Sequence, residues 1–284
     1  MTDVVFLNGR FVPRPEATVS IDDRGFLFGD AVYEVVRVAR GSFVEAERHL
    51  KRLERSLRET AIPPLRLEPL GVAKELLGRN GLTQRDAVVY LQVSRGAAQR
   101  QHAFPSPPVP PTVLMTATPF QPRPELAERG VAVITQPDLR WSRCDIKSVN
   151  LLPNVLAAER AAEAGAFEAI LLRDGVVTEA TRSNVFVVLA GIIRTHPTGP
   201  LILPGVTREV VLDLAAEAGL SVSEEAVTSA ELARADEVFV TGTTSDVMPI
   251  VSIDGRRVGS GLPGPVATQL GQLLTQRIEA GVPA

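Results

Sequence analysis

Proline distribution constrains this chain more than any other feature, because eight of its 22 prolines lie between Pro105 and Pro124. Proline has no amide hydrogen and a fixed φ angle, so neither a helix nor a central strand can run through such a stretch. Residues 112–118 contain no proline and predict one strand within it, and residues 119–124 are expected to form an interdomain linker. For a chain of 284 residues this predicts two domains, at 1–118 and 125–284.

The N-terminal half alternates short extended segments with two amphipathic helices. Asn8-Gly9 lies between two apolar runs and is the dipeptide most typical of a two-residue hairpin turn. Apolar residues spaced by three and four positions predict helices, and alternating or continuous apolar runs predict strands. The expected elements are strands at 4–7, 10–12, 32–38 and 87–94 and helices at 45–61 and 68–77.

The C-terminal half shows the same mixture of elements. Asp174-Gly175 and Asp254-Gly255 predict two further hairpins. The expected elements are strands at 130–135, 169–172, 176–178, 184–189 and 236–241 and helices at 150–164, at 207–218 and from 265 onward. Strands and helices in both halves predict an α+β protein of two α/β domains.

Composition excludes several classes of protein. The formal net charge is −3 and the charges are dispersed, which gives no basic surface for nucleic acid. A single cysteine, Cys144, rules out an internal disulfide framework. The N-terminus lacks the pattern of a signal peptide, and the most apolar run, residues 185–193, is far shorter than a membrane helix. We therefore expect a soluble protein of the cytoplasm that binds neither nucleic acid nor membrane.

Two kinds of site are not supported by the sequence. Residues 259–264 fit the G-x-G-x-x-G pattern, but they follow a hairpin near the C-terminus, where no βαβ unit remains to form a dinucleotide site. A glycine-rich turn before the last helix explains them. The three histidines are far apart in sequence and there is one cysteine, so no metal site is expected.

Lysine is scarce, and this narrows the candidates for amine chemistry. Of the 30 basic residues only Lys51, Lys74 and Lys147 are lysine. Lys51 and Lys74 fall on the polar sides of predicted helices and are expected to be solvated. Lys147 has apolar neighbours just before a predicted helix. An amine in an apolar cleft loses hydration and becomes a nucleophile for a carbonyl, although an exposed loop lysine is the alternative.

Two loops and one carboxylate complete a candidate cofactor site. Residues 204–207 open a predicted helix, whose free amide groups favour an anion, and residues 242–244 follow a strand and offer hydroxyls. Each alone is also typical of a helix cap or a turn. Glu179 follows a hairpin strand; it is either a surface carboxylate or the partner of a pyridine nitrogen. Together with Lys147, these features indicate a phosphorylated aldehyde cofactor.

The order of several motifs identifies a resemblance that covers nearly the whole chain. The motifs are Asp23-Arg24-Gly25-Phe26, residues 28–30, residues 32–36, the run from Arg143 to Leu152, Thr178-Glu179, residues 183–186 and residues 241–245. In this order they resemble the class IV (fold-type IV) pyridoxal-phosphate aminotransferases, most closely the D-amino-acid branch of that family. The resemblance implies two α/β domains with pyridoxal 5'-phosphate in the cleft between them.

The resemblance also implies a role for each matched residue. Lys147 corresponds to the lysine that forms a Schiff base with the cofactor and later moves a proton, and Glu179 to the acid that pairs with the pyridine nitrogen. Arg52, Val206, Thr207 and Thr243 correspond to phosphate-binding positions. Ser183 and Asn184 match positions near the cofactor ring, and Leu203 matches a residue that packs beside it.

Substrate choice is expected to depend on Arg100 and His102, which resemble the R-x-H carboxylate-binding motif of the D-amino-acid enzymes. Alternate residues of an extended segment point the same way, so both can bind one anion. Tyr33 corresponds to the phenol of that site. In the family the arginine and histidine come from the other subunit, which implies a homodimer. The expected reaction is transamination between a D-amino acid, such as D-alanine, and 2-oxoglutarate or pyruvate.

Other functions remain open at this point. On the same fold they are a branched-chain L-amino-acid aminotransferase, an R-selective amine aminotransferase and an aminodeoxychorismate lyase. A non-catalytic protein that binds the cofactor or phosphate is the alternative from another class.

Overall fold

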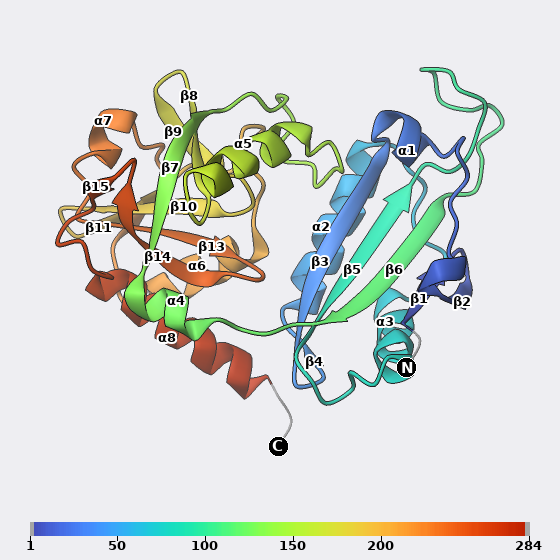
Figure 1. Cartoon of the computed structure of the whole chain (residues 1–284), viewed down its shortest axis with the longest axis horizontal. Coiled ribbons are helices and arrows are strands. Elements are labelled where there is room, and N and C mark those ends of the chain that lie inside the picture. Colours follow the sequence, from blue (N-terminus) through green and yellow to red (C-terminus); the bar gives the residue numbers. More distant parts are fainter. Residues whose placement is uncertain (1–2, 282–284) are drawn as a thin grey trace. The chain divides into compact units, whose positions relative to one another are not determined.

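The computed structural model describes residues 3–281, and its contacts divide the chain into two units (Figure 1). The first unit contains the described residues up to Gln121 together with Ile146–Asn150 and Gly281. The second contains Pro122–Asp145 and Leu151–Ala280. The segment that carries Lys147 therefore belongs to the first unit, although both its neighbours in sequence belong to the second. The linker expected at 119–124 remains a prediction.

The first unit is built on a six-stranded antiparallel sheet with the order β2-β1-β6-β5-β3-β4. Asn8 and Gly9 have positive φ angles of 49° and 87°, as a two-residue hairpin turn between β1 and β2 requires, so the first predicted hairpin is confirmed. The strands are β1 (Val4–Leu7), β2 (Arg10–Pro13), β3 (Ala31–Ala39), β4 (Ser42–Phe43), β5 (Ala87–Ser94) and β6 (Thr112–Pro119).

Helices α2 (Ala46–Glu59) and α3 (Pro69–Arg79) pack on one face of this sheet (Figure 1). Leu53 and Leu57 of α2 enter the core, and Leu76 of α3 is fully buried beside them. Lys51 and Lys74 are exposed on these helices, as their positions in the apolar pattern predict. Two short elements precede β3, namely η1 (Arg14–Glu16) and α1 (Arg24–Phe28).

The second unit is built on a mixed sheet with the order β12-β11-β10-β13-β14-β7-β8-β9, and β15 pairs with β14. The pairs β11/β12, β14/β7 and β7/β8 are parallel, and the others are antiparallel. The strands are β7 (Val131–Pro137), β8 (Ala169–Arg173), β9 (Val176–Ala180), β10 (Asn184–Leu189), β11 (Ile192–Thr195), β12 (Val222–Ser223), β13 (Glu237–Gly242), β14 (Asp246–Ile253) and β15 (Arg256–Arg257).

Five helices accompany this sheet: α4 (Pro124–Arg129), α5 (Leu152–Glu163), α6 (Val206–Glu217), α7 (Ser229–Leu232) and α8 (Pro265–Ala280). Val211 of α6 and Leu270 of α8 form one core with Phe186 and Phe239, whose rings stack 4.9 Å apart. A second core contains Val185 and further strand residues. Within residues 3–281, no helix is long and apolar enough to cross a membrane.

Candidate active site

Lys147 lies at the edge of the first unit's sheet, beside the start of β3. The Tyr33 amide donates to the carbonyl oxygen of Lys147 at 2.9 Å, and the Val149 amide donates to that of Ala31 at 3.1 Å. The Lys147 amide also reaches the Ser56 hydroxyl of α2 at 3.3 Å. The lysine backbone is thus held from two elements, and its side chain is half-buried, with Nζ 4.3 Å from the centroid of the Tyr33 ring.

Arg52 is bound into a buried ionic cluster next to this segment. Its Nε and Nη2 donate to the two carboxylate oxygens of Glu34 at 2.7 and 2.9 Å, and His49 Nδ1 lies 2.8 Å from Glu34 Oε2. Burial opposes ionisation of Glu34, but the charge and hydrogen bonds of Arg52, the hydrogen bond with His49 and the charge of Lys147 lower its pKa to about 2. The ionised carboxylate of Glu34 therefore fixes the orientation of the Arg52 side chain, and the positive charge of Lys147 acts on the same carboxylate.

Glu179 is buried at the end of β9 in the second unit. Its Oε1 accepts a hydrogen bond from Arg140 Nη1, and its Oε2 accepts from the Leu203 amide at 3.0 Å and from Asn184 Nδ2 at 3.1 Å. Burial raises the pKa of Glu179 to about 7, although Arg140 and the Leu203 amide act against this rise. The carboxyl group can therefore hold or release a proton near neutral pH.

The two predicted phosphate-binding loops lie around the start of β10. Asn184 Nδ2 donates to the Leu203 carbonyl at 2.9 Å, and a Cβ atom on Gly205 would lie 2.1 Å from Asn184 Oδ1. Gly205 begins α6 with no side-chain cap, so Val206 and Thr207 form an uncapped first turn. A Cβ atom on Gly242, which directly precedes Thr243, would lie 3.6 Å from Ser183 Cβ. Glu179, Ser183, Asn184, Leu203 and both loops therefore form one cluster.

Arg100 and His102 lie in an exposed loop of the first unit and contact the same aromatic ring. The Arg100 guanidinium carbon is 5.2 Å from the centroid of Phe28, and the His102 ring centroid is 5.6 Å from it. Tyr33, the third predicted carboxylate-binding residue, lies instead on β3, beside Tyr90 and Lys147. The structure thus gathers the predicted residues in three places, two in the first unit and one in the second.

Comparison with known proteins places this arrangement in a family. The family model for class IV aminotransferases matches residues 31–253. The chain belongs to the class IV aminotransferases. The D-alanine aminotransferase of Bacillus licheniformis is 46% identical over 276 residues, which are 96% of each chain. That of Staphylococcus epidermidis is 42% identical over 279 residues, 97% of this chain and 98% of the relative.

Solved structures of class IV aminotransferases share the fold. A branched-chain amino acid aminotransferase from T.th., solved with pyridoxamine 5'-phosphate, has a TM-score of 0.89 and 29% identity, and the match covers 100% of this chain and 96% of that one. The branched-chain enzyme of Escherichia coli has a TM-score of 0.88 and 26% identity, and the match again covers 100% of this chain and 96% of that one. The predicted family and the predicted α+β fold of fold type IV are confirmed.

Sequence reasoning missed two groups of charged residues that hold the candidate site residues of the second unit. Arg140 is held by Asp138 through bonds of 2.8 Å from both Nε and Nη2 and thereby presents Nη1 to Glu179. Glu168 is buried and accepts from the Ser183 hydroxyl at 2.8 Å and from the Thr181 hydroxyl at 3.0 Å. Asp138 and Arg140 follow β7 at alternate positions, and this spacing was the one local signal for their pairing.

Proposed function

We propose that this class IV aminotransferase uses pyridoxal 5'-phosphate to transfer an amino group between a D-amino acid, such as D-alanine, and a 2-oxo acid, such as 2-oxoglutarate or pyruvate. The similarity to D-alanine aminotransferases over nearly the full length of both chains carries this proposal. We also propose a cytoplasmic location, since a single cysteine is typical of a chain that folds without internal disulfides.

The described residues fit the cofactor. The uncapped first turn of α6 offers amide donors to a phosphate group, and the adjacent Asn184 leaves no room for a side chain at Gly205. The Thr241 hydroxyl, which precedes Gly242, is buried and finds no hydrogen-bond partner among the described residues. We assign the phosphate group to Val206, Thr207, Thr243 and Arg52. Ser183, Asn184 and Leu203 would lie beside the ring.

Lys147 has two tasks in this proposal. Its Nζ would hold the aldehyde group of the cofactor, and as a free amine it would take up the substrate's Cα proton. The 4.3 Å approach of Nζ to the Tyr33 ring supports this, because the face of an aromatic ring stabilises the protonated amine between transfers.

Glu179 serves the pyridine nitrogen of the same cofactor in this proposal. Its pKa of about 7 lets the carboxyl group ionise beside a cationic ring nitrogen and hold the proton on that nitrogen. When bound, the cofactor supplies an electron sink for the electron pair left by the substrate's Cα proton. Arg140 keeps the carboxylate available by opposing the effect of burial.

Arg100, His102 and Tyr33 bind the substrate carboxylate, and we propose that Arg100 and His102 do so in the site of a second copy of this chain. In one chain both side chains are exposed. Phe104, two positions after His102, is 56% exposed, and Phe26 of α1 is 76% exposed. A homodimer would cover these exposed side chains.

A pair of substrates tests the reaction. We expect the purified enzyme to transaminate D-alanine with 2-oxoglutarate, and Lys147→Ala to abolish turnover. The runner-up is a branched-chain L-amino-acid aminotransferase, which the structural similarity to such enzymes favours. Activity with L-leucine but not with D-alanine would establish that function instead. Near-normal transamination by Lys147→Ala would contradict the assignment of the lysine.

A further inference from the structure

Arg24 is a buried cation that none of the roles above uses. It is the first residue of α1 and is 3% exposed. Its guanidinium donors are directed at the backbone of the loop that carries Arg100 and His102. Nη1 donates to the carbonyl oxygen of Gln101 at 2.6 Å and lies 3.4 Å from that of Ala103, and Nη2 donates to that of His102 at 3.3 Å.

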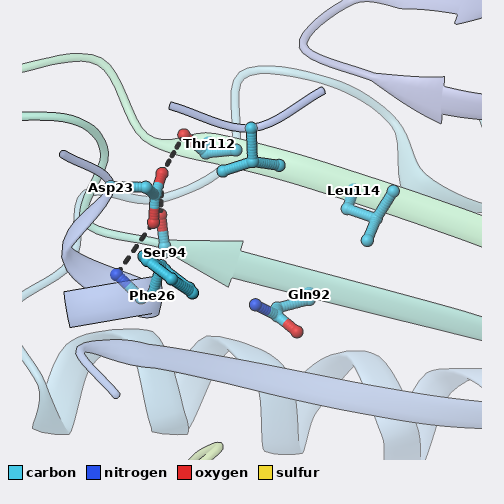
Figure 2. Close-up of a pocket in the computed structure, with 8 residues that line it drawn as sticks. Asp23, Phe26, Gln92, Ser94, Thr112 and Leu114 are labelled. Carbon is cyan, nitrogen blue, oxygen red and sulfur yellow. Dashed lines mark hydrogen bonds between the residues drawn. The ribbon is translucent and has the colours of Figure 1, made fainter. Parts of the chain in front are cut away.

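Helix α1 is itself fixed to the sheet. Figure 2 shows Asp23, which caps the helix, beside β5 and β6. Its carboxylate accepts from the Gly25 amide at 2.8 Å, from the Ser94 hydroxyl at 3.0 Å and from the Thr112 hydroxyl at 2.6 Å. Arg24 therefore extends from a helix that two strands hold in place.

Asp30 fixes the orientation of the guanidinium. It accepts from Arg24 Nε at 2.8 Å and from Arg95 Nε and Nη2 at 2.7 and 2.9 Å. Partial burial opposes ionisation of Asp30, but the hydrogen bonds and charges of Arg95 and Arg24 outweigh it and lower its pKa. An ionised carboxylate thus holds one edge of Arg24, which leaves Nη1 and Nη2 to bind the loop.

The side chains of Arg100 and His102 contact the same helix, α1. The ring of Phe28, the last residue of α1, contacts Arg24 at 4.8 Å, Arg100 at 5.2 Å and the His102 ring at 5.6 Å, all measured to its centroid. α1 therefore contacts both the backbone of the loop, through Arg24, and its two functional side chains, through Phe28.

We propose that Arg24 is a positioning residue for substrate recognition, which holds residues 101–103 so that Arg100 and His102 form a fixed pair for the substrate carboxylate. This inference rests on the proposed function of that pair. Without the guanidinium group, three loop carbonyl groups hydrogen-bond to water instead, and the loop samples other conformations. Substrate binding must then order the loop, which costs binding free energy. The cost falls on substrate binding, because Arg24 does not touch the reacting atoms.

The experiment compares Arg24→Met with wild type and with Arg194→Met. Arg194 donates to the Ala226 carbonyl and pairs with Glu231, so its loss removes a similar set of bonds away from every proposed site residue. We expect Arg24→Met to raise KM for D-alanine at least about tenfold, with kcat at saturation within about twofold of wild type. Arg194→Met should leave both unchanged.

Two further measurements separate positioning from general stability. Hydrogen exchange in the holoenzyme should rise about tenfold or more for amides of residues 100–104 in Arg24→Met, and stay unchanged in the flanking strands β5 and β6. In an Arg100→Met background, Arg24→Met should add little to KM, because both changes remove the same interaction. Arg24→Lys keeps the charge beside Asp30 but not the fork of donors, and should give an intermediate KM if Arg24→Met fails to fold.

The outcomes distinguish this inference from the proposed function. Wild-type enzyme without D-alanine activity would contradict the proposed function, and the exchange measurement would still decide whether Arg24 holds the loop. An unchanged KM in Arg24→Met or Arg24→Lys, in an enzyme active on D-alanine, would overturn the role of Arg24 alone. A fall in kcat without a rise in KM would overturn it as well.

Discussion

The positive charge of one residue, Arg140, makes the buried carboxyl group of Glu179 easier to ionise. Glu179 would be strongly disfavoured as an anion at its buried position, and the adjacent guanidinium brings its pKa back to about 7. Asp138 neutralises Arg140 in turn, and hydrogen bonds from Arg140 and Thr178 hold the pKa of Asp138 low against partial burial. The charge state of the proposed cofactor partner thus depends on burial, which raises the pKa, and on Arg140 and the Leu203 amide, which lower it.

Replacing Arg140 should make Glu179 harder to ionise. In Arg140→Gln the pKa of Glu179 should rise by about 1 to 3 pH units, since an opposite charge is removed beside a buried carboxylate. Carbon NMR of labelled glutamate in cofactor-free protein, with Glu179→Gln for assignment, measures it. Arg173→Gln is the matched control, because Arg173 lies 3.2 Å from Asp138 but does not bond Glu179. An unchanged Glu179 titration in Arg140→Gln would refute the role of Arg140.

Covalent trapping should identify Lys147 alone. We expect borohydride to fix the cofactor to the peptide that contains Lys147, because Lys51 and Lys74 are exposed on helices while Lys147 is half-buried beside Tyr33. Peptide mass spectrometry reads the site. A Lys51→Arg/Lys74→Arg variant should label as wild type does, and label on either of those lysines in the wild type would contradict the assignment.

Residue types and local spacing separated Lys147 from the other two lysines and singled out Glu179, because scarcity and neighbouring sequence carry that information. They did not reveal Arg140 or Arg24. The partners of these arginines lie 39 and 77 positions away along the chain, and only the fold brings them together. The spacing of Asp138 and Arg140 signals their own pairing, but nothing local signals the contact of Arg140 with Glu179 or that of Arg24 with Gln101.

Helix α6 shows how an element positions the turn to which we assign the phosphate group. Its first turn is left uncapped at Gly205, and Asn184 fills the space where a side chain would lie. Asn184 in turn bonds Glu179 and Leu203. The start of one helix, the start of β10 and the end of β9 are thereby packed together, so a change at Gly205 affects all three.

Gly205→Ala should weaken cofactor binding. The new Cβ atom would meet Asn184 Oδ1 at 2.1 Å, so Asn184 must leave its bond to the Glu179 carboxylate. Loss of a hydrogen bond to a charged group costs about 1.5–3 kcal/mol, which corresponds to roughly a 10- to 150-fold rise in Kd for pyridoxal 5'-phosphate. Fluorescence titration of cofactor-free protein measures this. Gly199→Ala, where a Cβ atom meets nothing within 4 Å, should bind as wild type does.

Elements with strong local signals were predicted well. Asn8-Gly9, Asp174-Gly175 and Asp254-Gly255 all form the expected hairpin turns, and β5 and β10 have their predicted bounds. The short elements were missed. α1 spans five residues, too few for an apolar period to show, and α4 begins at Pro124, which reads as linker sequence but is well suited to the first turn of a helix.

At the scale of the whole molecule, the proposed dimer can be tested by mixing inactive variants. Lys147→Ala should be inactive alone, and Arg100→Met should keep only weak activity. If Arg100 completes the partner's site, half of randomly mixed dimers have one complete site, so about a quarter of wild-type activity should appear after subunit exchange. A mixture of Lys147→Ala and Glu179→Gln should stay inactive, because neither site of that mixed dimer is complete. No recovery in the first mixture would place Arg100 in its own subunit's site.

Residues 146–150 return to the first unit, and this return determines where the side chain of Lys147 points. Two backbone hydrogen bonds to β3 and one isolated bridge, between Val32 and Ser148, align its backbone. Because this pairing fixes which residue lies beside Tyr33, a slip of one residue would put a neighbour of Lys147 in its place. Extra residues before Ile146 or after Asn150 are therefore compatible with a correctly directed amine as long as this register is kept. A single deletion inside the segment would turn the amine away from Tyr33 while leaving the composition of the site almost unchanged.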